Sequence, residues 1–221
     1  MKIEVEQDVM QVNRTYAAQN RADFSAQRLC VVNILGSPGA GKTTLLERLL
    51  PLLQAEGITP AVIEGDLATA KDAARIAESG VPVVQINTDG GCHLDAKMIA
   101  RVLPAFDLAS LDLLLIENVG NLVCPASFDL GEDVRIVVLS VPEGGDKPSK
   151  YPATFLSAGI VVLNKMDLAP YVEIDLAAVH ADILALKPDM RIIETSCRRG
   201  MESGLKELAT ELVARMREKL A

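Results

Sequence analysis

The sequence predicts a three-layer α/β domain, in which helices cover both faces of a mostly parallel sheet. From Leu29 onward, short apolar runs alternate with segments of helical character. Each run is continuously apolar, which is typical of strands buried on both faces. The glycine-rich segment "GSPGAGKTT", residues 36–44, follows the first run and opens a helical segment. Strands separated by helices usually pair in parallel, and such sheets bind ligands beyond the carboxyl ends of their strands.

The composition is that of a globular domain with an acidic surface. The 221 residues are enough for one domain with a substantial core. Aromatic residues make up only 3%, so we expect an aliphatic core. The formal net charge is -8 and no basic tract occurs. These charges argue against nucleic acid and against an anionic membrane as partners.

The elements follow one another in a regular order. Residues 1–28 are polar with scattered apolar side chains, which predicts a helical arm outside the core. Residues 29–221 are expected to form the main domain, with strands at 29–35, 60–65, 81–86, 111–117, 134–140, 159–164 and 190–195. Helices are expected between them at 42–55, 69–79, 93–104, 150–157, 174–186 and 203–219.

The N-terminus and the cysteines indicate a cytoplasmic protein. The first ten residues, "MKIEVEQDVM", carry charges where a signal peptide has an apolar run. No apolar stretch approaches the roughly 18 residues of a membrane span. None of the four cysteines lies in a CxxC pair. In a reducing compartment, we expect them to be core residues or metal ligands and not disulfides.

The segment "GSPGAGKTT" fits the phosphate-loop pattern G-x-x-x-x-G-K-[ST]. Its glycines allow backbone N–H groups to surround phosphate oxygens at the positive end of a helix. Lys42 is expected to reach the β and γ phosphates, and Thr43 to bind Mg²⁺. The alternative is a turn that only joins a strand to a helix, but the strand–loop–helix context favours nucleotide binding. The predicted contacts are Gly36, Gly39, Ala40, Gly41, Lys42, Thr43 and Thr44.

The segment "NKMD", Asn164 to Asp167, predicts that the nucleotide is a guanine nucleotide. A carboxylate at Asp167 suits the N–H donors on one edge of guanine, and Asn164 can meet the O6 and N7 side. Lys165 can lay its alkyl stem along the base. The segment "TSC" ends the last strand, where Ser196 and Cys197 could add a backbone N–H to O6. The alternative for Asp167 is a helix N-cap.

Two carboxylates at strand ends predict a hydrolytic centre. Asp66 closes "IEGD" after the second strand, and Glu117 lies in "IENVG" after the fourth, near Gly120. Carboxylates beside a phosphate loop can hold Mg²⁺ through water and can orient an attacking water. The alternative is that each acidic side chain is simply solvated.

A third group of residues has ligands for a soft or borderline metal. Cys92 and His93 are adjacent in "GGCHLDA" and are expected to start a helix, and Cys124 follows the fourth strand in "NLVCP". Both loops should emerge at the same edge of the sheet. Thiolate and imidazole suit Zn²⁺, Ni²⁺ or copper. A dipeptide and one distant cysteine are weak evidence by themselves, and ordinary packing roles stay open on this ground.

The motifs taken together resemble those of a known family. "GSPGAGKTT", "EGD", "GGCHLDA", "ENVGNLVCP", "GGDKPSKYP" and "NKMD" occur in the order found in the hydrogenase nickel incorporation GTPase family HypB. The resemblance covers residues 29–221. It implies a SIMIBI-class P-loop GTPase that hydrolyses GTP to GDP and delivers nickel to [NiFe]-hydrogenase. It also implies a metal site at Cys92, His93 and Cys124 that lies at a dimer interface.

The resemblance has further implications, and one departure. It implies a homodimer promoted by GTP and metal, a HypA-like metallochaperone as partner, and the hydrogenase large-subunit precursor as client. Many members carry an N-terminal Cys-rich or His-rich nickel motif. Here no cysteine precedes Cys30 and the only other histidine is His180. We therefore expect no high-affinity nickel site in the N-terminal segment.

Three other functions and several isolated residues complete the sequence-based expectations. A urease-type nickel accessory GTPase has a Cys-Pro-His motif, unlike the adjacent Cys92 and His93. A nucleotide-gated scaffold would show little turnover, and a small-molecule kinase is disfavoured by "NKMD" and by the lack of an Arg-rich lid. Packing or surface roles are expected for Cys30, Cys197 and His180. Lys147 and Lys150 could contact nucleotide or partner, or lie in a solvated loop.

Overall fold

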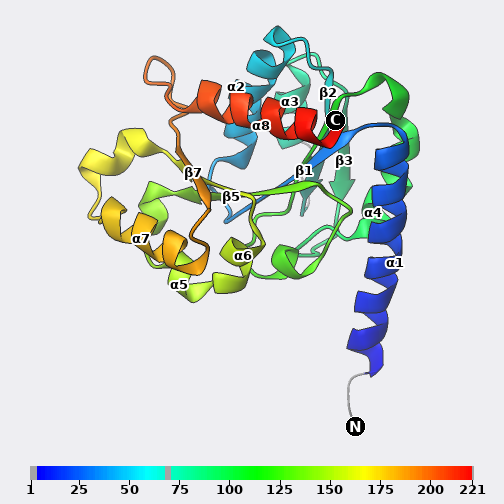
Figure 1. The fold of residues 1–221 in the computed structure, drawn as a ribbon, viewed down its shortest axis with the longest axis horizontal. Helices are drawn as coiled ribbons and strands as arrows, with labels where there is room; N and C mark the ends of the chain where they lie inside the picture. Colours follow the sequence, from blue (N-terminus) through cyan, green and yellow to red (C-terminus); the bar gives the residue numbers. More distant parts are fainter. Residues whose placement is uncertain (1–3, 68–70, 221) are drawn as a thin grey trace.

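The computed structural model of the chain describes residues 4–67 and 71–220 and confirms the α/β fold (Figure 1). The helix expected at 69–79 begins at two residues outside this range, and α3, Lys71–Ala77, is the part described. Within the described residues, no helix is both long enough and apolar enough to cross a bilayer.

Seven parallel strands form one sheet in the order β3-β2-β4-β1-β5-β6-β7. Their bounds are β1 Cys30–Gly36, β2 Pro60–Asp66, β3 Val83–Asn87, β4 Leu113–Glu117, β5 Val134–Ser140, β6 Ile160–Asn164 and β7 Arg191–Glu194. The predicted strands are all present. The five inner strands are almost entirely buried, whereas the edge strands β3 and β7 are partly exposed. β1 lies at the centre, where the strand order reverses direction. In sheets of this kind, the reversal opens a crevice for a ligand at the carboxyl ends of the strands.

Helices cover both faces of this sheet. In the described chain they are α1 Glu4–Ala26, α2 Lys42–Ala55, α3 Lys71–Ala77, α4 Ala96–Val102, α5 Lys147–Lys150, α6 Pro152–Ser157, α7 Leu176–Leu186 and α8 Leu205–Leu220. Short 3-10 turns are η1 Leu103–Ala105, η2 Leu108–Ser110, η3 Cys124–Ser127, η4 Val141–Glu143 and η5 Met166–Tyr171. These turns were not predicted, because three to six residues are too few to show a helical period.

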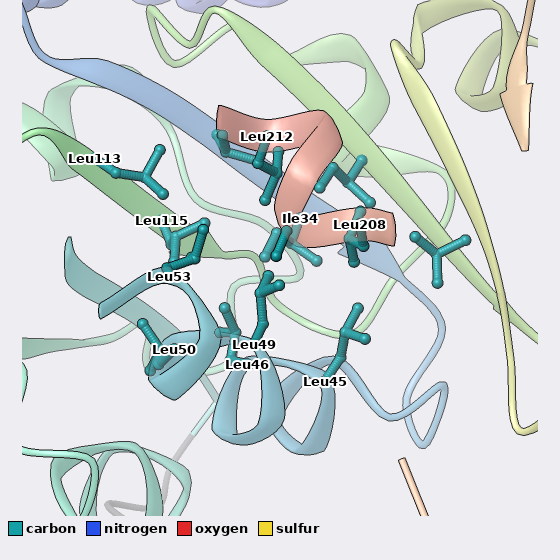
Figure 2. Packing of buried hydrophobic residues seen from close by; sticks show 14 of the residues in the cluster. Ile34, Leu45, Leu46, Leu49, Leu50, Leu53, Leu113, Leu115, Leu208 and Leu212 are labelled. Atoms are coloured by element: carbon teal, nitrogen blue, oxygen red, sulfur yellow. The ribbon is translucent and has the colours of Figure 1, made fainter. Parts of the chain in front are cut away.

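The core on one face joins α2 and α8 to the central strands (Figure 2). Leucines of α2 recur every three or four residues, so they form one apolar stripe. They pack against Ile34 of β1, Leu113 and Leu115 of β4, and Leu208 and Leu212 of α8. Fully burying one leucine stabilises the fold by about 1.5–3 kcal/mol. The start of α2 is therefore anchored under the carboxyl end of β1.

Two separate clusters cover the opposite face. One packs α1 and α4 against β2 and β4, and includes Phe24 and Ile99. The other packs α6 and α7 against β5 and β6, and includes Phe155 and Val179. Strand β1 contributes to both clusters, with Val31 in the first and Leu35 in the second.

The structure corrects the expected position of the N-terminal arm. Residues 4–26 are helical as predicted, and α1 runs beside α4 with its first turns extending beyond the other elements (Figure 1). Its C-terminal half, however, belongs to the core, because Ala17 and Phe24 are buried. Asn13 and Asn20 are also buried. Polar residues at these two positions made the segment look solvated, although both amides find partners inside the protein.

Two further boundaries differ from expectation. The helix expected at 93–104 begins only at Ala96, because the Asp95 carboxylate accepts the Met98 N–H and caps it. His93 and its neighbour Cys92 therefore precede the helix and do not start it. The segment expected as a long loop after β5 contains α5, Lys147–Lys150, so it is not simply a solvated loop.

Candidate nucleotide and metal sites

The loop at 36–41 joins β1 to α2 and has the shape of a phosphate-binding loop. At Gly41 the φ angle is 95°, and a Cβ atom there would lie 2.6 Å from Asn164 Nδ2. A side chain would therefore block the contact between this loop and the sheet. The buried Lys42 Nζ lies 3.5 Å from the Gly36 carbonyl oxygen, and burial lowers the pKa of Lys42. The loop thus presents backbone N–H groups and one enclosed cation to the same space.

A cavity of about 420 Å³ opens above this loop. This volume lies within the usual range for small-molecule sites. The lining comes from the phosphate loop and the start of α2, the carboxyl ends of β2, β4 and β6, and α3. It includes Gly39, Gly41, Lys42, Thr43, Thr44, Asp66, Asp72, Arg75, Glu117, Gly120 and Lys165. The structure therefore gathers most of the predicted phosphate and carboxylate residues around one space.

A hydroxyl and a carboxylate meet at the base of the cavity. Thr43 Oγ1 donates a hydrogen bond to Glu117 Oε1 at 2.8 Å. The other carboxylate oxygen of Glu117 is buried and has no hydrogen-bond partner among the described residues. Burial raises the pKa of Glu117 to about 7, against the lowering effect of Lys42. Asp66 lies at the end of β2, on the same cavity. Oxygen ligands so arranged fit a hard cation such as Mg²⁺.

Glu64 is a cavity residue that the sequence reasoning missed. It lies on β2 directly opposite Glu117 of β4 in the strand register, and it is only 2% exposed. Burial, together with the nearby Glu117 and Asp66, raises the pKa of Glu64 to about 8. A carboxylate inside the apolar run "PAVIEG" was a usable signal, because glutamate is almost never fully buried without a role or a partner.

The predicted base-binding loop is tied to the phosphate loop. Asn164 Nδ2 donates to the Ala40 carbonyl at 2.9 Å, and Thr195 Oγ1 donates to Asn164 Oδ1 at 3.1 Å. Lys165 has φ 63° and donates from Nζ to the Gly39 carbonyl at 2.5 Å. Protein groups therefore occupy the Asn164 amide, and its expected contact with the O6 and N7 side of guanine stays a prediction.

Asp167 is held by the segment that follows β7. Ser196 Oγ donates to Asp167 Oδ1 at 2.8 Å, and Arg198 lies 4.0 Å from Asp167 Oδ2. Lys165, and not Asp167, occupies the N-cap position of η5. The side chain of Asp167 is nearly buried, with 9% exposed. A carboxylate fixed in this way can select a donor pair on a base edge.

Cys92, His93 and Cys124 converge on one point of the surface. Their ligand atoms all lie within 4.8 Å of one another, and no other such group occurs among the described residues. Cys92 Sγ lies 3.6 Å from His93 Nδ1. The His93 ring stacks on Phe128, with centroids 3.8 Å apart. Cys92 is exposed, so this site is open to solvent.

The surroundings of Cys92 and His93 shift the pKa values of both side chains, which affects how a metal would bind. The hydrogen bond with Cys124 raises the pKa of Cys92, and burial adds to the effect. Burial lowers the pKa of His93, against the nearby Asp95, which favours the neutral imidazole. A metal that binds here must displace thiol protons, so its affinity rises with pH.

The segment 118–121 connects the two sites. The Asn121 main chain donates to the Gly36 carbonyl at 3.0 Å, and its amide side chain donates to the Cys92 carbonyl at 3.2 Å. Asn118 lines the cavity and its Oδ1 accepts the Leu94 N–H at 3.1 Å. One short segment therefore touches the phosphate loop and the residues beside the metal ligands.

The remaining predicted residues contact other residues of the protein. Cys30 is buried, as expected. Cys197 is also buried, with its thiol 3.6 Å from Asn164 Oδ1. His180 Nε2 lies 2.9 Å from Glu194 Oε1 on the surface. Lys147 lies over the Tyr151 ring, 5.9 Å from its centroid, and Lys150 pairs with Asp146.

Comparison with known proteins gives consistent results. Residues 30–194 match the family described as CobW/HypB/UreG, nucleotide-binding domain. The chain is 50% identical to the hydrogenase maturation factor HypB of Azotobacter chroococcum mcd 1 and 49% identical to that of Escherichia coli (strain K12). These alignments cover 91% and 96% of this chain. The chain spans only 66% and 73% of the relatives' lengths.

One solved structure has a very similar fold. HypB from Helicobacter pylori, determined in complex with nickel, is 38% identical. The superposition has a TM-score of 0.85 and covers 93% of this chain and 95% of that one.

Proposed function

The chain belongs to the HypB family within the CobW/HypB/UreG nucleotide-binding domains, and from this premise we propose that it is a GTPase that delivers nickel during [NiFe]-hydrogenase maturation. One observation carries the proposal: Asn121 hydrogen-bonds both to the phosphate loop, at Gly36, and to the metal-ligand segment, at Cys92. A nucleotide site and a thiolate–imidazole site on one short connection can influence each other's affinity.

GTP or GDP binds in the cavity above the phosphate loop. Backbone N–H groups of the loop and the Lys42 ammonium meet the phosphates. Asp167 reads the base, and Ser196 keeps the carboxylate in place. Support comes from the near burial of Asp167 and its hydrogen bond at 2.8 Å, because a fixed acceptor discriminates between bases more strongly than a mobile one.

Hydrolysis takes place between the phosphate loop and the carboxylates. Thr43, Asp66 and Glu117 hold Mg²⁺, which neutralises charge on the phosphates when it is bound. Lys42 stabilises the negative charge that develops on the transferred γ-phosphoryl group. Asp66 and Glu117 also orient the attacking water. The support is the placement of Glu117 and Thr43 at 2.8 Å, with a second carboxylate oxygen facing no described partner.

The nickel ion is the cargo, held by Cys92, His93 and Cys124; Zn²⁺ suits the same ligands. One chain offers three ligands, and a closed tetrahedral site needs four. The fourth comes from water or from a second copy of the chain, in a homodimer that GTP and metal promote. The exposed Cys92 supports this arrangement, because a cargo site must be reachable by donor and acceptor.

The partners follow from the family and from the open metal site. A HypA-like metallochaperone exchanges nickel with this site, and the precursor of the hydrogenase large subunit receives it, both in the cytoplasm. Val123 is 56% exposed beside Cys124, which gives a partner an apolar contact next to the metal.

The proposal is tested by titrating Ni²⁺ into protein loaded with GDP or with a non-hydrolysable GTP analogue. We expect the two nickel affinities to differ by roughly 5-fold to 150-fold, the usual range of coupling between sites. Nickel must then change GTP affinity by the same factor. Isothermal titration measures both quantities, and sedimentation of the same samples reports the dimer. Identical nickel isotherms in the two nucleotide states would refute the coupling.

A further inference from the structure

Two buried asparagines of α1 reach into the metal-ligand region. Asn13 Nδ2 donates to the Asp129 carbonyl at 2.9 Å, and Asn13 Oδ1 accepts the Ala96 N–H at 2.9 Å. Asn20 Nδ2 donates to the Ala96 carbonyl at 2.8 Å and to the Leu130 carbonyl at 2.9 Å. The two side chains therefore hydrogen-bond to the same residue: Asn13 to the Ala96 N–H and Asn20 to the Ala96 carbonyl.

The two segments that the asparagines bind, at Ala96 and at residues 129–130, lie close in sequence to the metal ligands or to the ring that stacks on one of them. Ala96 follows His93 by three residues and is the first residue of α4. Asp129 follows Phe128, whose ring stacks on the His93 imidazole. The segment that carries Phe128 leads back to Cys124 through η3. The asparagines thus tie together the chain segments that bring the histidine and the second cysteine to one place.

Helix α1 lies very close to the segment that contains residues 129–131. At Gly131, with φ 93°, a Cβ atom would lie 2.8 Å from the Ala17 carbonyl and 2.9 Å from the Arg21 N–H nitrogen. Only glycine allows this approach. Asn20 is 0% exposed and Asn13 is 4% exposed, so their hydrogen bonds are made inside the protein, where an unmade hydrogen bond is costly. Loss of the Asn13 amide removes the partner of the Ala96 N–H, and loss of the Asn20 amide removes its bond to the Leu130 carbonyl, so the tie between the two segments is lost.

We infer that Asn13 and Asn20 are positioning residues of the metal site, which makes α1 a functional part of that site. This inference rests on the proposed metal binding by Cys92, His93 and Cys124. The asparagines do not touch the metal. They fix the backbone on either side of the His93–Phe128 stack, and so hold the imidazole where it meets the two thiols.

The test compares Asn20→Ala with a matched control, Gln19→Ala. The control removes an amide from the adjacent position on α1, but that amide is exposed and bonds only within the helix, to Asp23. Ni²⁺ and Co²⁺ are titrated into the full chain loaded with GDP. The intensity and position of the thiolate-to-metal absorption band are recorded with the affinity. GDP affinity and thermal unfolding are measured on the same samples.

We expect Asn20→Ala to weaken nickel binding by about 10-fold or more, as is found when outer partners of metal ligands are removed, and to shift the absorption band. GDP affinity should stay within about twofold of the wild type, because Asn20 does not line the nucleotide cavity. Gln19→Ala should behave as wild type. Asn13→Ser is a second variant that carries the same test if Asn20→Ala does not fold.

Three results would overturn the inference. Wild-type nickel affinity and spectrum in folded Asn20→Ala or Asn13→Ser would show that these asparagines do not position the ligands. An equal loss in Gln19→Ala would assign the effect to the helix in general. Failure of the wild type itself to bind nickel would remove the proposed metal site as well, so the two hypotheses fail in different ways.

Discussion

The segment 118–121 touches both the nucleotide site and the residues beside the metal ligands, yet the two sites are built differently. Central nucleotide residues lie at a strand end or at the start of α2 and are buried: Lys42 is 7% exposed and Asn164 is 1% exposed. The metal ligands come from the segment before α4 and from η3, and Cys92 is exposed. The first site is an extension of the core, whereas the second is a surface site that loops and α1 hold in place.

The difference in burial matches the difference in task. A base-reading carboxylate must not move, because discrimination depends on leaving the wrong base unpaired. A cargo site must admit and release its ion, so its ligands need solvent and partner access. The same comparison predicts which properties each substitution will change and which it will leave intact.

The largest expected effect is at the nucleotide site, on the choice of base. Asp167→Asn should reverse base preference, because an amide presents a donor where guanine also presents a donor. The resulting loss of GTP relative to xanthosine triphosphate is expected to be on the order of 10⁴-fold. Competition for a labelled GTP analogue by GTP, ATP and xanthosine triphosphate measures it. Equal displacement by GTP and ATP from the wild type would contradict base reading by this residue. Nickel affinity should be unchanged.

The next effect is on turnover alone. Lys42→Ala should lower the rate of phosphate release by about 10²–10³-fold or more, because the developing charge on the γ-phosphoryl group loses its enclosed cation. The buried leucine stripe of α2 is unaffected, so the circular dichroism spectrum should match the wild type. Normal turnover by a folded variant would sink the assignment of Lys42 to catalysis.

The smallest effect on nucleotide affinity is expected from a substitution at the metal site. Cys124→Ala should remove the nickel-dependent change in nucleotide affinity while GDP alone binds within about twofold of the wild type. The reason is that Cys124 does not line the nucleotide cavity. Titration of GDP with and without Ni²⁺ measures the difference. A variant that kept the full nickel effect would place the coupling metal elsewhere in the protein. A matched change at Cys30, a buried cysteine outside both sites, is the control.

Local patterns in the sequence were sufficient for the parts of the protein that depend on local geometry. The phosphate loop is recognisable because glycine at position 41, a lysine and a threonine follow one strand directly. The strand β5 was placed at 134–140, as observed, because its apolar run is continuous. Helix α2 was placed at 42–55, also as observed, because its leucines keep a helical period.

Tertiary structure decided what depends on contacts between distant segments. The opposition of Glu64 and Glu117 follows from the register of β2 against β4, which no local pattern encodes. Asn13 and Asn20 looked like solvated residues, because a polar side chain carries no mark of a backbone partner more than 70 positions away, as Ala96 is from Asn20. Composition and periodicity record how each segment folds. Packing alone determines which buried amide or carboxylate meets which other segment.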